Sequence, residues 1–331
     1  MARRAGVSEA TVSRVLNGKP GASDATRATV LKALDATGYG LPRRGLPHRP
    51  RLVGLVLPEL QNPVFPALAE VVTGALAQQN IMPVLWTPTV AELPAPGYVD
   101  PLLEYEISGV IFAGGMYSQA DASRDHYRRL REKKLPVVVV NPTVGGLEFP
   151  RVATDDVAAV QQAATHLYQL GHRRIGLVLG PEQHVPSDRK AEAFQTFTTR
   201  TGDLAATRVE RVGFGLDGGR VGGGRLIERG ITGVICGSDI LALGVIRAAR
   251  RAGLRVPEDL SVIGYDDSAF LASTDPPLTT VRQPIDAIGR TVVALLVDQI
   301  NGVVVPPDEL LFEPGLVVRA STAPPGRGSA H

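Results

Sequence analysis

Residues 5–18 read AGVSEATVSRVLNG, and this stretch has the features of a short helix that follows a tight turn. Gly6 can adopt a positive φ in the turn. Ser8 is a favourable N-cap, and Glu9 lies in the first helical turn, where a negative charge interacts well with the helix dipole. The pattern predicts a helix over Glu9–Asn17. Val15 and Leu16 lie three and four positions after Val12, so the three apolar side chains share one face of this helix, which we expect to point inward.

A second capped helix follows after the Gly- and Pro-containing segment 18–21. Ser23 caps it, the pattern extends over Asp24–Thr37, and Gly38 closes it. Its predicted inward residues are Val30, Leu31 and Leu34. The order of a helix, a glycine turn, the helix capped by Ser8, a loop and the helix capped by Ser23 is that of a helix-turn-helix motif. In this motif the helix that follows the turn enters the major groove of DNA.

The charge of the chain is unevenly distributed. Residues 1–51 contain ten Lys and Arg against three Asp and Glu, a net charge of +7, whereas residues 52–331 contain 25 basic and 30 acidic residues, a net charge of −5. A basic head on a mildly acidic body indicates that the head meets a polyanion, with a solvated basic tail as the alternative. Phosphate contacts from such a head make binding strongly dependent on salt.

Residues 5–39, AGVSEATVSRVLNGKPGASDATRATVLKALDATGY, resemble the DNA-binding head of the LacI/GalR repressor family, for which the run AGVS-x-x-TVSRVLNG is specific. The resemblance implies that three residues face base edges and four hold backbone phosphates. The first group is Glu9, Ala10 and Arg14, and the second group is Ser8, Thr11, Ser13 and Asn17.

Two of these assignments have alternatives. Arg14 is the residue best suited to a bidentate contact with guanine, and a phosphate clamp or a solvated charge is its rival interpretation. Glu9 can accept a hydrogen bond from a cytosine amino group, or it can simply stabilise the helix N-terminus.

The head departs from the family pattern at both ends. Met1 stands where the family has a valine within its first helix, so we expect the natural start to lie upstream. In the family a hinge helix with a minor-groove leucine follows the head. Here residues 41–51 contain three prolines and a glycine, which disfavour a long helix. Arg43, Arg44 and Leu46 are the candidates for minor-groove contact, and a flexible basic linker is the alternative.

From residue 52 onward, short apolar runs alternate with segments of helical spacing, which predicts an α/β fold with parallel sheets. Two such series predict two Rossmann-like lobes with a ligand cleft at the carboxyl ends of their strands. The predicted strands are 52–57, 82–86, 110–113, 137–140, 175–179, 209–214, 234–236 and 260–264. The predicted helices are 66–79, 99–107, 123–133, 157–170, 189–199, 220–228 and 240–252.

The family resemblance extends over this region through LVGLVLPELQNPVFPAL, HLYQLGHRRIGLVLG, CGSDILALGVIRAARRAGLRVPEDLSVIGYDDS and TDPPLTTVRQP. It implies a ligand-sensing domain of the type I periplasmic-binding-protein kind over residues 52–331, behind a helix-turn-helix domain (1–40) and a linker (41–51). The first lobe is expected at about 52–153 and 284–307. The second is expected at about 154–283 and 308–322, with three crossings between the lobes.

By position, the resemblance implies six effector-binding residues: Asn62, Phe65, Arg189, Phe214, Ser238 and Asp266. A guanidinium fork and a carboxylate can each pair with vicinal hydroxyls, which favours Arg189 and Asp266 as sugar contacts. A salt bridge between the lobes is the alternative for both. Core packing is the alternative for Phe214, and neighbouring Asp239 is expected to cap the next helix.

Other signals are weaker. Residues 213–218 match G-x-G-x-x-G, but the preceding run is charged and no acidic residue follows at the right distance, so no nucleotide is expected. The six histidines show no metal spacing, no catalytic constellation is apparent, and we expect no cofactor and no enzyme activity. His172 is interpreted as a loop residue. The single cysteine excludes internal disulfides, and the lack of a signal peptide or a membrane-length apolar run favours the cytoplasm.

These observations predict a homodimeric repressor that binds a near-palindromic operator and responds to a small effector. A mono- or oligosaccharide is the expected effector, with a purine or another metabolite as the alternative. A solute-binding protein without a DNA role is the rival function, and an enzyme on the same fold is a third. Whether the effector releases or recruits DNA stays open.

Overall fold

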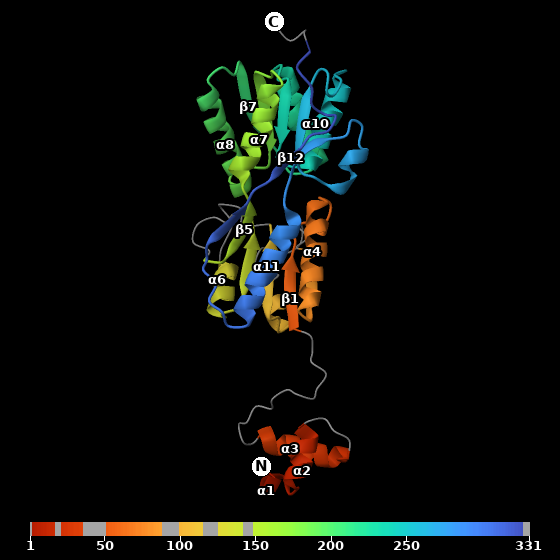
Figure 1. Ribbon diagram of the computed structural model, residues 1–331, viewed down its shortest axis with the longest axis vertical. Helices are drawn as coiled ribbons and strands as arrows, with labels where there is room; N and C mark the ends of the chain where they lie inside the picture. The colour runs from red at the N-terminus through yellow and green to blue at the C-terminus, as the bar shows by residue number, and fades with distance from the viewer. Residues whose placement is uncertain are drawn as a thin grey trace. The chain divides into compact units, whose positions relative to one another are not determined.

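The computed structural model describes residues 2–16, 21–35, 51–87, 99–114, 125–141 and 148–326. The chain divides into two units, Met1–Arg51 and Leu52–His331, and each is described by itself (Figure 1). The described part of the first unit is helical, and the second unit contains two six-stranded sheets.

Serine caps begin two of the helices of the first unit. Ser8 Oγ accepts the backbone N–H of Thr11 at 3.1 Å, and Ser23 Oγ accepts that of Thr26 at 3.2 Å. Each bond satisfies a donor that the helix itself leaves unpaired. The turn between the first two helices contains Gly6 with φ at 64°. The helices are α1 Ala2–Ala5, α2 Glu9–Leu16 and α3 Asp24–Asp35.

The core of this unit is small and forms where the helices meet. Val30 of α3 is fully buried, and Val12 and Val15 of α2 pack with it and with Ala5 of α1. Val12 and Val15, which the sequence predicts on the inward face of α2, are therefore buried. Three further residues are predicted to point inward, but their side chains are not among those that the structure describes: Leu16, Leu31 and Leu34.

The first lobe of the second unit is a sheet in the order β11-β5-β4-β3-β1-β2, with helices on both faces. Its strands are β1 Arg51–Val56, β2 Ile81–Trp86, β3 Gly109–Ala113, β4 Val137–Val140, β5 Arg151–Thr154 and β11 Glu309–Phe312. Its helices are α4 Val64–Gln78, α5 Val99–Glu104, α6 Asp125–Glu132 and α11 Ile285–Ile300.

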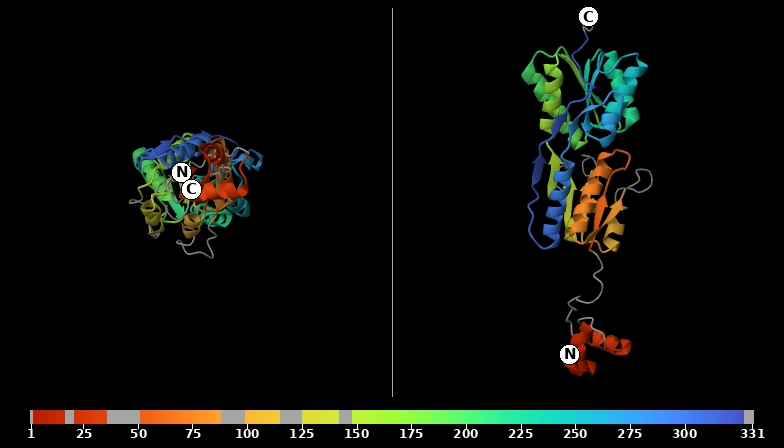
Figure 2. Two further views of the ribbon diagram at one scale, coloured as in Figure 1. Left: turned by 90° about the horizontal axis from the view of Figure 1, so that it is seen from below. Right: turned by 45° about the vertical axis from the view of Figure 1, so that its right-hand side comes forward.

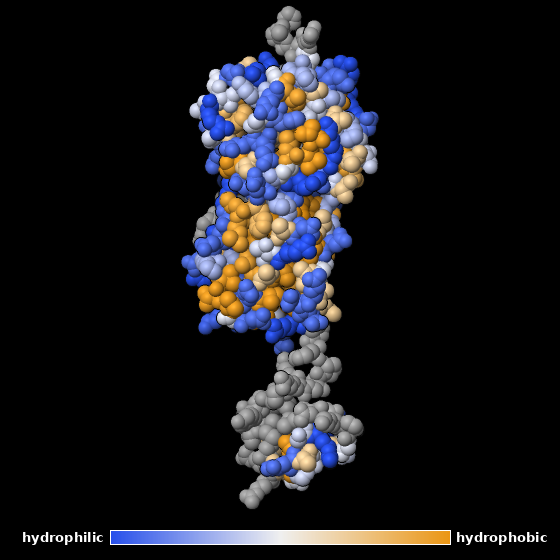
Figure 3. Space-filling model, in the orientation of Figure 1, coloured by the Kyte–Doolittle hydropathy of each residue, from blue (hydrophilic) through white to orange (hydrophobic). Residues whose placement is uncertain are grey.

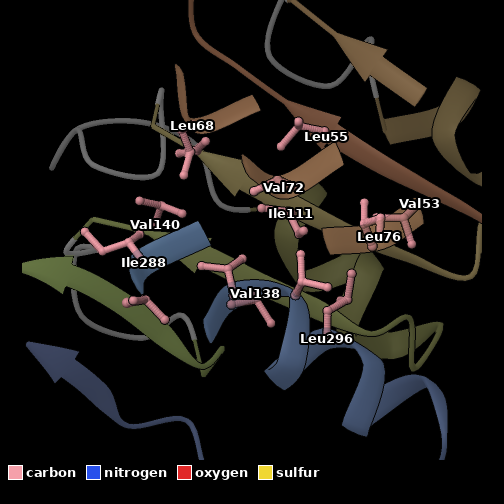
Figure 4. Packing of buried hydrophobic residues seen from close by; sticks show 14 of the residues in the cluster. Val53, Leu55, Leu68, Val72, Leu76, Ile111, Val138, Val140, Ile288 and Leu296 are labelled. Atoms are coloured by element: carbon pink, nitrogen blue, oxygen red, sulfur yellow. The ribbon is translucent and has the colours of Figure 1, made fainter. Parts of the chain in front are cut away.

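The two faces of this sheet bury different side chains. Leu55 and Ile111 point to α4 and α11, where they meet Leu68 and Leu296 (Figure 4). The next residues along each strand, among them Phe112, face α5 and α6. Strands that are buried on both sides explain the continuous apolar runs from which they are predicted.

The second lobe repeats this architecture, in the order β12-β10-β9-β8-β6-β7. Its strands are β6 Arg174–Leu179, β7 Ala206–Arg211, β8 Gly233–Cys236, β9 Ser261–Asp266, β10 Thr279–Arg282 and β12 Gly315–Val317. Its helices are α7 Asp156–Gln169, α8 Val185–Thr201, α9 Leu216–Glu228 and α10 Asp239–Arg251, with a 3₁₀ turn at Ala269–Ser273. Helices α7 and α8 cover one face, and α9 and α10 cover the other.

The chain passes between the lobes after β5, after β10 and after β11 (Figure 2). The expectation that residues 308–322 belong wholly to the second lobe is wrong for β11. This strand pairs in parallel with β5, Glu309 opposite Arg151, and only β12 joins the second sheet. Because α11 returns the chain to the amino end of the first sheet, the next strand runs along β5 before it crosses.

Gly218, the last glycine of the G-x-G-x-x-G run, packs against the carbonyl oxygen of Gly213, and the glycines that follow it in α9 have a further packing role. A Cβ added to Gly219 would lie 2.1 Å from the carbonyl oxygen of Leu241, and one on Gly244 would lie 2.3 Å from that of Leu216. Glycines therefore allow α9 and α10 to approach at backbone distance. This close contact explains why α9 is rich in glycine, and no bound nucleotide is needed to explain it.

Candidate effector cleft and DNA-binding head

A cleft of about 430 Å³ lies between the two lobes of the second unit. It is lined by segments that follow the strands of both sheets, as the carboxyl ends of parallel strands in this kind of fold predict. Five of the six predicted effector residues line it: Asn62, Phe65, Phe214, Ser238 and Asp266.

Asp266, the last residue of β9, links the lobes inside the cleft. Its carboxylate accepts hydrogen bonds from Gln283 Nε2 at 2.7 Å and from Asn62 Nδ2 of the first lobe at 3.4 Å. Gln283 lies at the second crossing and also accepts the hydroxyl of Thr154 at 2.7 Å. Burial raises the pKa of Asp266 well above its ordinary value, and the nearby Asp239 carboxylate adds to this. The backbone of Asp266 has φ at 126°, a conformation that is rare for a residue with a side chain.

A buried ion pair forms the neighbouring part of the wall. Lys190 Nζ bonds Asp156 Oδ1, with 7% and 5% of the two side chains exposed. The ammonium also lies 4.1 Å from the ring centroid of Tyr265, where it makes a cation–π contact. Burial raises the pKa of the Asp156 carboxyl, while Lys190 lowers it. A charged donor and a charged acceptor thus lie together at a cleft that is otherwise largely apolar.

Aromatic rings line both lobes. Phe65 belongs to the first lobe and Phe214 to the second. Phe214 is 49% exposed, so core packing does not account for it. Its ring lies over Gly180, where an added Cβ would come within 2.2 Å, and meets the His184 ring edge-on at 5.1 Å between centroids. Burial lowers the pKa of His184 to about 4, so this ring is neutral at pH 7.

Ser238, not Asp239, caps the helix that follows β8, and it also lines the cleft. Ser238 is the N-cap of α10, because its Oγ accepts the N–H of Leu241 at 3.2 Å. Asp239 is fully buried and instead accepts hydrogen bonds from Ser268 and, at 2.6 Å, from Thr280. The capping role expected of Asp239 is therefore wrong, because its carboxylate points into the lobe.

Arg189 lies outside the cleft, contrary to expectation. Its guanidinium forms two hydrogen bonds with the Glu309 carboxylate, at 2.8 and 3.0 Å. The side chain that reaches the cleft from this part of α8 is Lys190. Adjacent helix residues point about 100° apart, so only one of the two can face the ligand space. The salt bridge between lobes, the alternative interpretation for Arg189, is the one observed.

Several cleft residues were missed from the sequence. Lys190 stands next to the expected arginine, and Asp156 is the first residue of α7, directly after the N-cap Asp155; neither is among the residues predicted from the sequence. His184, Gln283 and Tyr265 carry no local signal. His172 is also more than a loop residue: it is buried and lies within hydrogen-bond distance of Thr232 and Ser261.

The predicted DNA-contacting side chains of α2 are largely on its surface. Glu9, Ala10, Ser13 and Arg14 are exposed. Ser8 and Thr11 share a hydrogen bond of 2.9 Å between their hydroxyls. The remaining predicted contacts lie outside the described residues: Asn17, Arg43, Arg44 and Leu46.

The described residues include neither a membrane-spanning helix nor a cluster of metal ligands. No helix in that part of the chain is long and apolar enough to cross a membrane. Within the same residues, no group of three or more His, Cys, Asp or Glu side chains is arranged to hold a metal ion.

A capped helix-turn-helix head and a two-lobed body with a cleft define a class of DNA-binding, ligand-sensing regulators. Residues 1–40 match the model for bacterial regulatory proteins of the lacI family, and residues 164–322 match that for the periplasmic binding protein-like domain. The HTH-type transcriptional regulator MalR of Streptomyces coelicolor is 46% identical over 328 residues, which cover 98% of this chain and 95% of that protein. The chain therefore belongs to the lacI family.

Two further relatives extend the comparison. The HTH-type transcriptional repressor CytR of Escherichia coli is 32% identical over 97% of this chain and 95% of its own length. The complex of the transcriptional regulator CelR with cellobiose has a TM-score of 0.71 and 30% identity, and the match covers 97% of this chain and 98% of that one.

Proposed function

We propose that this protein is a transcriptional repressor that binds a near-palindromic operator as a homodimer and is controlled by a sugar that occupies the cleft between its lobes. The observation that carries the proposal is the presence, in one chain, of an exposed capped helix and a cleft lined by paired polar groups. Relatives of similar length that are named as a regulator and a repressor support it. The proposed role involves no catalysis and is exerted in the cytoplasm, where the DNA is.

The chemistry of the cleft suits a polyhydroxyl ligand. Asp266 supplies a carboxyl, Asn62 supplies an amide, and Lys190 with Asp156 supplies a cation beside an anion. Vicinal hydroxyls both donate and accept, so they match such mixed sets better than a purely apolar molecule does. Phe214 offers an exposed ring for the C–H face of a sugar. A bound sugar would form hydrogen bonds with these cleft groups, and those bonds would replace the ones that the groups now make with each other.

The DNA contacts follow from the exposed face of α2. We propose that Glu9, Ala10 and Arg14 face base edges, and that Arg14 forms the fork with guanine. The proposed phosphate contacts are Ser8, Thr11, Ser13 and Asn17, and the proposed minor-groove contacts are Arg43, Arg44 and Leu46.

A homodimer matches the two-fold symmetry of a palindrome. The second unit offers apolar surface for such an assembly. Met82 and Leu85 lie on the edge strand β2 with about half of each side chain exposed, and uncovered edge strands favour association. Figure 3 shows further apolar patches on the face of this unit that is seen there.

The test begins with selection of bound sequences from random DNA duplexes by the full-length protein. We expect a near-palindromic site. The selected duplex is then titrated in the presence of mono- and disaccharides, one of which should change the affinity by about 5- to 150-fold. Asp266→Asn should lose the response to the sugar and still bind DNA. Selection of no sequence would contradict the repressor, and a selected site that responds to no sugar would contradict the effector assignment.

A further inference from the structure

Three consecutive charged residues near the start of α8 each form an ion pair with a different element. Their partners lie on β7, on β11 of the other lobe and on α7. Because each residue turns the helix by about 100°, the three side chains point in three directions around its axis. The pairs are Asp188 with Arg211, Arg189 with Glu309, and Lys190 with Asp156.

The middle pair is the one that joins the lobes. Arg189 belongs to the second lobe, and Glu309 begins β11, which pairs with β5 in the first sheet. In the right-hand view of Figure 2, β11 is the blue strand at the left edge of the lower lobe. The contact is a two-bond fork, with 35% of the arginine and 19% of the glutamate side chain exposed. Bidentate pairs fix geometry as well as energy, so this one specifies how the lobes lie.

We propose that the Arg189–Glu309 pair is a latch that holds the lobes in the arrangement described here and thereby sets the affinity of the cleft. Neither residue lines the cleft, so a ligand need not displace the latch. The link between Asn62 and Asp266 differs in this respect, because its groups are the ones offered to a ligand. The latch is therefore a contact between the lobes that persists when the cleft is filled.

Helix α8 connects the latch to the ligand space. Lys190 faces the cleft, and Arg189, one residue before it, holds the first lobe. A shift of this turn changes both contacts together. Loss of the latch leaves the cleft chemistry intact but lowers the fraction of molecules in the competent arrangement, and the apparent affinity falls by that fraction.

The latch is tested by the distance between the lobes in the ligand-free protein. Cysteines introduced at Arg128 on α6 and Asp217 on α9 carry spin labels, since both side chains are exposed and Cys236 is buried. Labelled chains are diluted with unlabelled chains, so that pulsed EPR reports distances within one chain. We expect one narrow distribution for the parent protein and a broader one for Arg189→Ala.

Glu309→Ala should broaden the distribution equally, and the double variant should add nothing to either single variant. Arg255→Ala is the matched control, because it breaks an arginine–carboxylate pair with Asp259 inside the second lobe. It should leave the distances unchanged. Unchanged distances in Arg189→Ala, or effects of the two single variants that add in the double variant, would overturn the latch.

The effect on affinity rests on the proposed function, whereas the distance measurement does not. For the sugar found in the operator assay, Arg189→Ala should weaken binding by about two- to fivefold, the range for a partly exposed ion pair. If no sugar binds, the proposed effector fails, and the distances still decide whether the latch exists.

Discussion

At the scale of single residues, Asp266 combines two energetically unfavourable features, a strained backbone and a buried carboxyl, that a purely structural position would avoid. Its φ of 126° is followed by 61° at Asp267, and its carboxyl is buried without a direct cation. Arg282 and Arg319 each bond Asp267 at 2.6 Å and hold this strained turn in place. Strain that is supported by its surroundings is characteristic of binding sites.

The raised pKa of Asp266 predicts how stability depends on pH. In the unfolded chain this carboxyl loses its proton near its ordinary pKa, whereas in the folded protein it keeps the proton to higher pH. Over that interval the folded state binds more protons, so its contribution to stability is present at low pH and is lost as the pH rises. Asp266→Asn removes this contribution to the slope.

Thermal unfolding of both proteins between about pH 4 and pH 8 measures the difference. The variant should lose less stability than the parent as the pH rises. Asp239, whose pKa burial raises to about 6, has the same sign and is present in both proteins, so some slope should remain. Parallel curves would show that folding does not raise the pKa of Asp266.

At the scale of elements, the long buried strands and amphipathic helices could be predicted, because their apolar pattern is local. The strands β5, β10, β11 and β12 could not, since each has only three or four residues and none consists entirely of β-branched residues like the equally short β4, which reads VVVV. Strand β7 was predicted at 209–214 but spans Ala206–Arg211. It is an edge strand, so its charged residues are tolerated and its register comes from β6.

Five of the six predicted cleft residues line the cleft, and the sixth, Arg189 on α8, lies one position before Lys190, which does. Gln283, directly after β10, was not predicted. The predicted helix began at Arg189, but α8 begins at Val185. Within a helix the face of a residue depends on the whole turn, and no local motif distinguishes Arg189 from Lys190. Their partners, Glu309 and Asp156, are distant in sequence, so the choice depends on tertiary structure.

The contact between α9 and α10 gives a prediction at this scale. Gly219→Ala places a methyl group against the carbonyl of Leu241, which cannot move without the helix, and should cost about 1–3 kcal/mol or more. Gly224→Ala, five residues further along α9, meets nothing within 4 Å and should stabilise the protein by about 0.5–1 kcal/mol. Urea unfolding followed by circular dichroism compares the two variants, and equal effects would exclude glycine-mediated packing.

At the scale of the whole molecule, charge and chemistry are divided between the two ends of the chain. The head has a net charge of +7 and the remainder −5, so attraction to DNA is concentrated where the capped helices are. At the cleft the opposite charges of Lys190 and Asp156 neutralise each other, which suits this part of the wall to a neutral ligand.

This division predicts how operator binding responds to salt. The salt dependence also distinguishes a contact of Arg14 with guanine from a contact with phosphate. The logarithm of the affinity should fall linearly with the logarithm of salt concentration, by about 0.9 for each phosphate that is neutralised. If Arg14 reads guanine, Arg14→Ala should cost about 1–3 kcal/mol, relax one operator position and leave the slope unchanged. Arg255→Ala, which removes an arginine paired with Asp259 inside the second lobe, is the control and should match the parent in slope and affinity when sugar is absent. A slope reduced by about 1 in Arg14→Ala, with the same loss on every sequence, would instead place its guanidinium on a phosphate.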